Sequence, residues 1–141
     1  MTILVHNTQL GRMERFEREP REPMPFANET MLVGEFRGRS LSQLLWTTSQ
    51  TMQSWTAFRR LWGQAIYAPF IFKRVGEGGH ADQSQHYAGT AFDVGQNLGS
   101  LQRSLMRQLA ERSGLWSYVE PAHLTPTWVG SRTGSDLSNK I

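Results

Sequence analysis

The chain contains no cysteine. Disulfide bonds, thiolate zinc sites and cysteine nucleophiles are therefore excluded, and any metal must be held by His, Asp or Glu. No run of 18 or more apolar residues occurs either, so we expect no transmembrane helix. The opening residues MTILV are too short, and lack the basic flank, for a signal peptide. The sequence predicts no export signal and leaves the compartment open.

Positive charge is present but is not concentrated. The formal net charge is +3 and the isoelectric point is about 9.8. Between residues 12 and 22, however, four arginines alternate with four glutamates. Such a mixed run is typical of a solvated surface, so we expect no nucleic-acid partner. The hydrophobic fraction of 38% and the five tryptophans predict a packed core, and 141 residues suit one domain.

The chain divides into three parts by composition. Three prolines between residues 20 and 25 exclude a helix there, so residues 1–40 are expected to form an extended N-terminal arm with a short strand at 31–33. Residues 41–130 are expected to form the single folded domain. Residues 131–141 are polar, and we expect them to be a mobile tail.

Apolar spacing predicts two helices in the domain. Ser40 is a suitable N-cap for a helix over 41–64, whose tryptophans we assign to the core. A second helix is expected from a cap at Asn97 to Gly114. Short strands are predicted at 70–72, 116–119 and 127–129. Two helices mixed with short strands indicate an α+β fold.

The stretch DQSQHYAGTAFDVG, residues 82–95, carries two side chains with metal-ligand chemistry. In a helix, the seven-residue spacing would separate His86 from Asp93 by roughly 10 Å along the axis. Sharing one ion therefore requires the chain to fold back, which Gly89 permits. Strand geometry after it would send Phe92 into the core and Asp93 into a cleft. The spacing permits a shared metal; the alternative is an ordinary loop histidine and strand-end aspartate.

A catalytic zinc site needs a third ligand and a carboxylate to take the proton of water. Only four histidines are available. We expect His6 to lie on the surface, and His80 adjoins the glycine-rich stretch GEGGH, which lacks the phosphate-loop pattern and is interpreted as a loop. His123 follows Glu120 by three residues, so both can reach one cavity.

The motif as a whole resembles that of a known family. Its five defined positions, Ser84-x-His86-x-x-Gly89-x-Ala91-x-Asp93, match the signature of the M15 zinc peptidases. These are D-Ala-D-Ala carboxypeptidases, D-Ala-D-Ala dipeptidases and related peptidoglycan endopeptidases, which share the Hedgehog/DD-peptidase fold. The resemblance covers roughly residues 70–130. It implies a small antiparallel sheet packed with two main helices.

The resemblance also implies site residues. His86 and Asp93 would be two zinc (Zn2+) ligands. In one branch of the family the base and third ligand form Glu-x-x-His, which Glu120 and His123 match. In other branches the ligand histidine follows Trp-Val, where this chain has Gly130. Either His123 completes the site with Glu120 as catalytic base, or the site is incomplete.

Two further residues are implied in substrate binding. Arg74 is the candidate for orienting a substrate carboxylate, and Ser84 is expected near the substrate. The function implied is zinc-dependent hydrolysis of D-amino-acid-containing peptide bonds in peptidoglycan, by a monomer with no membrane partner. The alternative is a degenerate, non-catalytic domain that binds cell-wall peptide or a protein partner.

Overall fold

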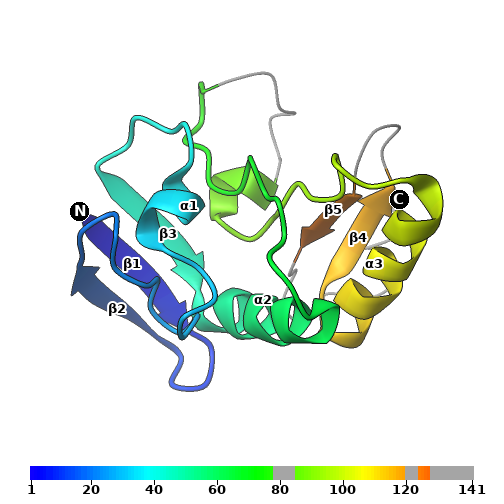
Figure 1. Ribbon diagram of the computed structural model, residues 1–141. Helices are drawn as coiled ribbons and strands as arrows, with labels where there is room; N and C mark the ends of the chain where they lie inside the picture. Colours follow the sequence, from blue (N-terminus) through cyan, green and yellow to red (C-terminus); the bar gives the residue numbers. More distant parts are fainter. Residues whose placement is uncertain (78–84, 120–123, 128–141) are drawn as a thin grey trace.

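Short strands at both ends of the chain flank two longer helices in the computed structural model, which describes residues 1–77, 85–119 and 124–127 (Figure 1). This arrangement confirms the α+β class. The elements, in chain order, are β1 (Thr2–Asn7), β2 (Arg12–Glu17), α1 (Val33–Arg37), β3 (Leu44–Thr48), α2 (Ser49–Trp62), the short 3-10 helix η1 (Gln85–Ala88), α3 (Ser100–Arg112), β4 (Trp116–Val119) and β5 (Leu124–Thr127).

The larger sheet has the strand order β2-β1-β3. β1 runs antiparallel to β2 and parallel to β3. The expectation of an antiparallel sheet is therefore wrong for this sheet, which is mixed, and holds only for the separate β4-β5 pair. Ile3 and Val5 project from one face of β1 into the core, with 0% exposure each. Side chains alternate along a strand, so the two buried residues share that face.

The expected extended arm over residues 1–40 is wrong. This segment contains β1, β2 and α1, and Phe36 packs in the same core as residues from α2. The strand expected at 31–33 is reduced to an isolated antiparallel bridge between Leu32 and Pro23, because α1 begins at Val33. The Glu35 side chain accepts a hydrogen bond from the Leu32 backbone N–H at 3.0 Å and so supports the start of that helix.

The helix expected over 41–64 is two elements. Residues 44–48 form β3, and α2 begins only at Ser49. The N-cap is Thr48 and not Ser40: the Thr48 hydroxyl accepts a hydrogen bond from Thr51 N–H at 3.0 Å. Gly63 ends α2 in the left-handed conformation, with φ of 84°.

α2 joins the two halves of the molecule. It contacts β1 and β3 on one side and α3 on the other, and α3 packs against β4 and β5. The buried face of α2 carries Met52, Trp55 and Phe58, so the expected core role of this tryptophan is confirmed. Phe92 is fully buried as expected and stacks on Trp55 with ring centres 4.7 Å apart. One core therefore extends from the larger sheet through α2 to α3.

The C-terminal half agrees more closely with the sequence. α3 starts after Gly99 and not at Asn97, and Gly114 follows its end with φ of 91°. β4 coincides with the predicted strand at 116–119. β5 occupies 124–127, so the strand expected at 127–129 shares only its first residue, and residues 128 and 129 lie outside the described part.

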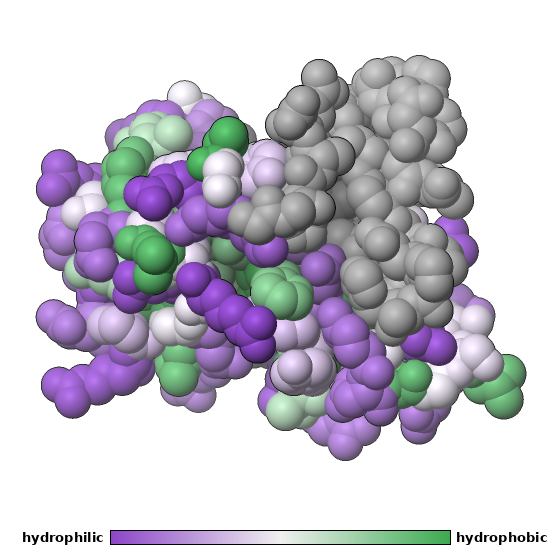
Figure 2. Space-filling view, turned by 90° about the horizontal axis from the view of Figure 1, so that it is seen from above, coloured by the Kyte–Doolittle hydropathy of each residue, from purple (hydrophilic) through white to green (hydrophobic). Residues whose placement is uncertain are grey.

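The surface facing the viewer in Figure 2 is largely hydrophilic, with hydrophobic residues in small separate patches on its coloured part. Within the described ranges, no helix combines the length and apolar character needed to cross a membrane.

Candidate functional site

The motif folds back on itself at Gly89, as its sequence predicted. η1 carries His86, and Gly89 follows with φ of 70°. The Thr90 hydroxyl and N–H then donate to the Gln85 side chain and backbone at 2.9 and 3.1 Å. A Cβ at Gly89 would lie 1.8 Å from the Trp46 carbonyl oxygen. Both the backbone angle and the close approach therefore require glycine here.

β3 holds this turn from the adjacent sheet. The Trp46 indole N–H donates to the Tyr87 carbonyl at 2.6 Å, and the Thr47 hydroxyl donates to the Gly89 carbonyl at 2.6 Å. Thr47 and Gly89 are both buried, so the second bond satisfies a carbonyl group that water does not reach easily. Residues 44–48, which were expected to belong to a helix, thus form the strand that supports the motif.

His86 and Asp93 come together in the interior. Nε2 of His86 lies 3.0 Å from Oδ1 of Asp93, and the two residues are 3% and 5% exposed. Backbone carbonyl groups of the segment 70–72 hold both residues in place. The Asp93 N–H donates to the Phe70 carbonyl at 2.9 Å, and Nδ1 of His86 lies 2.7 Å from the Ile71 carbonyl oxygen. The predicted strand at 70–72 is reduced to an isolated antiparallel bridge between Phe70 and Asp93.

These contacts fix where the imidazole hydrogen lies. A carbonyl oxygen only accepts, so Nδ1 of His86 carries the hydrogen that is donated to Ile71. In the neutral ring, Nε2 then presents its lone pair to the Asp93 carboxylate, which is itself an acceptor. Two acceptors 3.0 Å apart repel unless a proton or a metal ion lies between them. A proton on the imidazole gives a buried ion pair, a proton on the carboxyl group gives a neutral hydrogen bond, and a metal ion takes both groups as ligands.

The geometry fits the metal interpretation. Two donors bound to one tetrahedral zinc at roughly 2.0–2.1 Å lie about 3.3 Å apart. The separation of 3.0 Å between Nε2 and Oδ1 requires only a small opening. A ligating histidine commonly donates its other ring N–H to a backbone carbonyl, as His86 does to Ile71. His86 and Asp93 can therefore serve as two ligands of one ion.

The third predicted ligand His123, the predicted base Glu120 and the substrate-binding candidate Ser84 lie outside the described residues, as do His80 and Gly130. Within the described part, no cluster of three or more metal-ligating side chains occurs. His6 is exposed on β1, as expected, and is not part of the pair.

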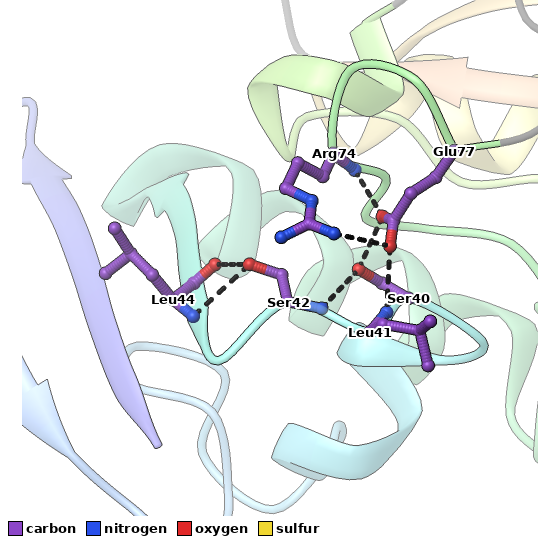
Figure 3. Close-up of polar contacts among 6 residues, drawn as sticks. All are labelled: Ser40, Leu41, Ser42, Leu44, Arg74 and Glu77. Atoms are coloured by element: carbon purple, nitrogen blue, oxygen red, sulfur yellow. Dashed lines mark hydrogen bonds and ion pairs between the residues drawn. The ribbon is translucent and has the colours of Figure 1, made fainter.

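Arg74 follows a residue that contacts the motif, since the N–H of Lys73 donates to the His86 carbonyl at 3.1 Å. Its side chain is 53% exposed and faces the Glu77 carboxylate at 3.7 Å (Figure 3). Glu77 also accepts hydrogen bonds from Ser40 Oγ, Leu41 N–H and Arg74 N–H at 2.7–2.9 Å. Arg74 is thus oriented by a carboxylate of its own loop.

The environment of Glu77 favours its charged form. Partial burial opposes ionisation, but the hydrogen bonds from Leu41, Ser40 and Arg74, with the nearby Arg74 charge, outweigh it and lower the pKa of Glu77. The carboxylate therefore ties the turn after α1 to the loop that carries Arg74. The Arg74–Glu77 spacing was visible in the sequence, but the contact with residues 40 and 41 was not.

Sequence reasoning also missed the carbonyl groups of Phe70 and Ile71, which orient Asp93 and His86. Backbone acceptors leave no residue-type signal, because every residue carries one. A scan against protein-family models found no match, and searches of curated proteins and of solved structures found none either.

Proposed function

We propose that the chain is a zinc-dependent peptidase that hydrolyses D-amino-acid-containing peptide bonds of peptidoglycan, with a Hedgehog/DD-peptidase-like fold. The observation that carries the proposal is the orientation of His86. Its Nδ1 is occupied by the Ile71 carbonyl, and its Nε2 faces Asp93 Oδ1 at 3.0 Å. The match of five motif positions to the M15 signature supports the same conclusion.

The proposal assigns a role to each residue. His86 and Asp93 hold the ion, and His123 is the third ligand. When bound, zinc supplies polarisation of the scissile carbonyl and acidification of a water molecule. Glu120 accepts the proton of the attacking water and passes it to the leaving amine. Arg74, oriented by Glu77, pairs with a substrate carboxylate, and Ser84 contributes to the substrate pocket.

Zinc content tests the proposal directly. Purified wild-type protein is expected to contain stoichiometric zinc by mass spectrometry and to cleave a peptide ending in D-Ala-D-Ala. Asp93→Asn and His123→Ala are expected to lower zinc affinity by at least about tenfold, because each removes one ligand. Glu120→Gln should keep its zinc and lose at least about a hundredfold in turnover.

His6→Ala is the matched control, since it removes an exposed histidine on β1 and should change neither zinc content nor turnover. Circular dichroism confirms that each variant is folded. Absence of stoichiometric zinc from the wild type after zinc loading would contradict the peptidase proposal. Full zinc retention by His123→Ala would contradict only the assignment of the third ligand.

The second candidate is a non-catalytic domain that binds cell-wall peptide or a protein partner. It is favoured by Gly130, which stands where other family branches have the ligand histidine. In this case His86 and Asp93 form a buried ion pair with a doubly protonated imidazole, an arrangement whose desolvation cost offsets much of its attraction. It predicts a folded protein without zinc that binds peptidoglycan fragments and leaves them intact.

A further inference from the structure

We propose that a small cavity between the turn after α1 and the segment 69–73 binds a carboxylate ligand with a small apolar body. The cavity has a volume of about 170 Å³. Its walls come from two chain segments, residues 37–40 and 69–73, and from Glu77. Ligand pockets for whole drug-sized molecules begin at about 300 Å³, so this volume suits one small acid or one end of a longer ligand.

Three cationic side chains line the cavity: Arg37, Arg39 and Lys73. In the part of the chain that the structure describes, none of them forms an ion pair with a carboxylate. Glu77 does not neutralise them, because its oxygens face Ser40, Leu41 and Arg74 (Figure 3). The cavity therefore keeps an excess of positive charge and favours an anion.

One of these donors is buried. Nε of Arg37 is shielded from solvent and has no hydrogen-bond partner among the described residues. Because Nε is closed to solvent, a ligand in the cavity reaches this side chain only through its terminal nitrogens, whose planar arrangement suits the two oxygens of a carboxylate.

The apolar wall of the cavity favours a ligand that has an apolar group as well as a carboxylate. The half-buried Phe70 ring lies 5.5 Å from Cζ of Arg39 and 4.5 Å from Nζ of Lys73, measured to the ring centre. These cation–π contacts hold the two cations beside an aromatic surface. A ligand with an apolar group can cover Phe70 and Pro69 while its carboxylate meets the cations.

The cavity is separate from the candidate metal site, although the segment 70–73 serves both. The backbone carbonyls of Phe70 and Ile71 hold Asp93 and His86, whereas the Phe70 and Lys73 side chains line the cavity. It also differs from Arg74, which does not line it. The inference therefore does not depend on the peptidase proposal.

Isobutyrate is the probe, and its neutral analogue isobutyramide is the matched ligand control. The full chain, labelled with ¹⁵N and without added zinc, is titrated while backbone amide shifts are followed. Isobutyrate is expected to shift amides of residues 37–40 and 70–73 saturably and with an affinity that falls as salt is added. Arg39→Gln combined with Lys73→Gln should raise the Kd at least about tenfold.

Arg12→Gln is the protein control, because it removes one exposed arginine on β2 and should change the Kd by less than about twofold. Phe70→Leu keeps the charge and should weaken isobutyrate binding while the spectrum shows a folded protein. N-acetyl-L-valine presents the same groups at a peptide end. The acid that binds more tightly therefore shows whether the cavity prefers a free small acid or the C-terminus of a peptide.

Three outcomes would overturn the inference. The first is the absence of saturable shifts at the cavity with either acid. The second is equal binding of isobutyramide, which would remove the role of charge. The third is equally tight binding of inorganic phosphate, which would remove the role of the apolar wall.

Discussion

Gly89 allows the motif to bring its two ligand residues together. Its φ of 70° lies in the left-handed region, and its α-carbon packs against the Trp46 carbonyl of β3. η1 precedes this turn and residues 90–93 follow it, and His86 and Asp93 face each other at 3.0 Å. Any side chain at Gly89 would push β3 and the turn apart.

Gly89→Ala is expected to destabilise the protein by more than about 3 kcal/mol, since the clash with backbone adds to the cost of a positive φ. Gly63→Ala separates the two effects. Gly63 also has positive φ, at 84°, but nothing lies within 4 Å of its would-be Cβ. That control should lose only about 1 kcal/mol, measured by urea unfolding. Equal losses would show that the close approach to Trp46 contributes nothing.

Glu77 makes stability depend on pH. Its folded pKa is lowered by hydrogen bonds and by Arg74, against the opposing effect of burial. A carboxyl group with a depressed folded pKa stabilises the protein above its unfolded pKa, and this contribution is lost as pH falls through the folded pKa. Glu77→Gln should therefore cost about 1 kcal/mol at pH 7, with the difference from wild type shrinking below about pH 4.

Unfolding midpoints in urea, measured from pH 7 down to the acid limit of folding, check this expectation. Glu29→Gln is the control: Glu29 is exposed, and its carboxylate makes no hydrogen bond in the described part of the chain. A Glu77→Gln difference that stays constant with pH would contradict the assigned role of the charge.

Among the elements, the junction of β3 and α2 decides the architecture around the motif. Thr48 ends the strand and caps the helix, with its hydroxyl accepting from Thr51 N–H at 3.0 Å. A helix continued back to Ser40 would remove Trp46 and Thr47 from the sheet and leave the Tyr87 and Gly89 carbonyls without these donors.

Thr48→Ala is expected to lower the free energy of unfolding by about 1 kcal/mol, through loss of the cap. Gln53→Ala, at an exposed position inside the same helix, should change stability by less than about 0.5 kcal/mol. Thermal unfolding followed by circular dichroism compares the two. If Thr48→Ala were no more destabilising than Gln53→Ala, the helix would not depend on this cap.

For the whole molecule, the N-terminal strand is part of the core and not an appendage. Ile3↔Leu45 and Val5↔Thr47 are partners in the parallel β1-β3 pair, and both β1 residues are fully buried. The folding of β3, and with it the support of the motif, should therefore depend on residues 2–7.

Ile3→Ala should destabilise the entire protein by about 2–5 kcal/mol, because it leaves a cavity in a shared core. Met13→Ala, at a position that is 57% exposed on β2, should cost less than about 0.5 kcal/mol. Near-ultraviolet circular dichroism and far-ultraviolet circular dichroism should report one coincident transition for Ile3→Ala. A separate early transition that leaves the near-ultraviolet signal unchanged would show that the N-terminal segment folds independently.

Local patterns predicted the elements whose signals are local. The positions of α3 and β4 were predicted, but the leucine spacing did not mark the buried face of α3: Leu101 is 87% and Leu105 is 49% exposed, and the buried residues are Met106 and Ala110. Leu41, Leu44 and Leu45 led to the incorrect prediction of a helix over residues 41–48, because their spacing fits a helical period as well as a strand. Leu41 is in fact 76% exposed, and Leu45 is buried in β3.

The motif spacing, together with Gly89, was enough to predict that His86 and Asp93 can meet, because a turn and its glycine lie within eight consecutive residues. What supports them could not be read from the chain. The parallel pairing of β1 with β3 and the carbonyl groups of Phe70 and Ile71 belong to segments far apart in sequence. Parallel pairing and backbone acceptors carry no residue-type signature, so packing alone selects them.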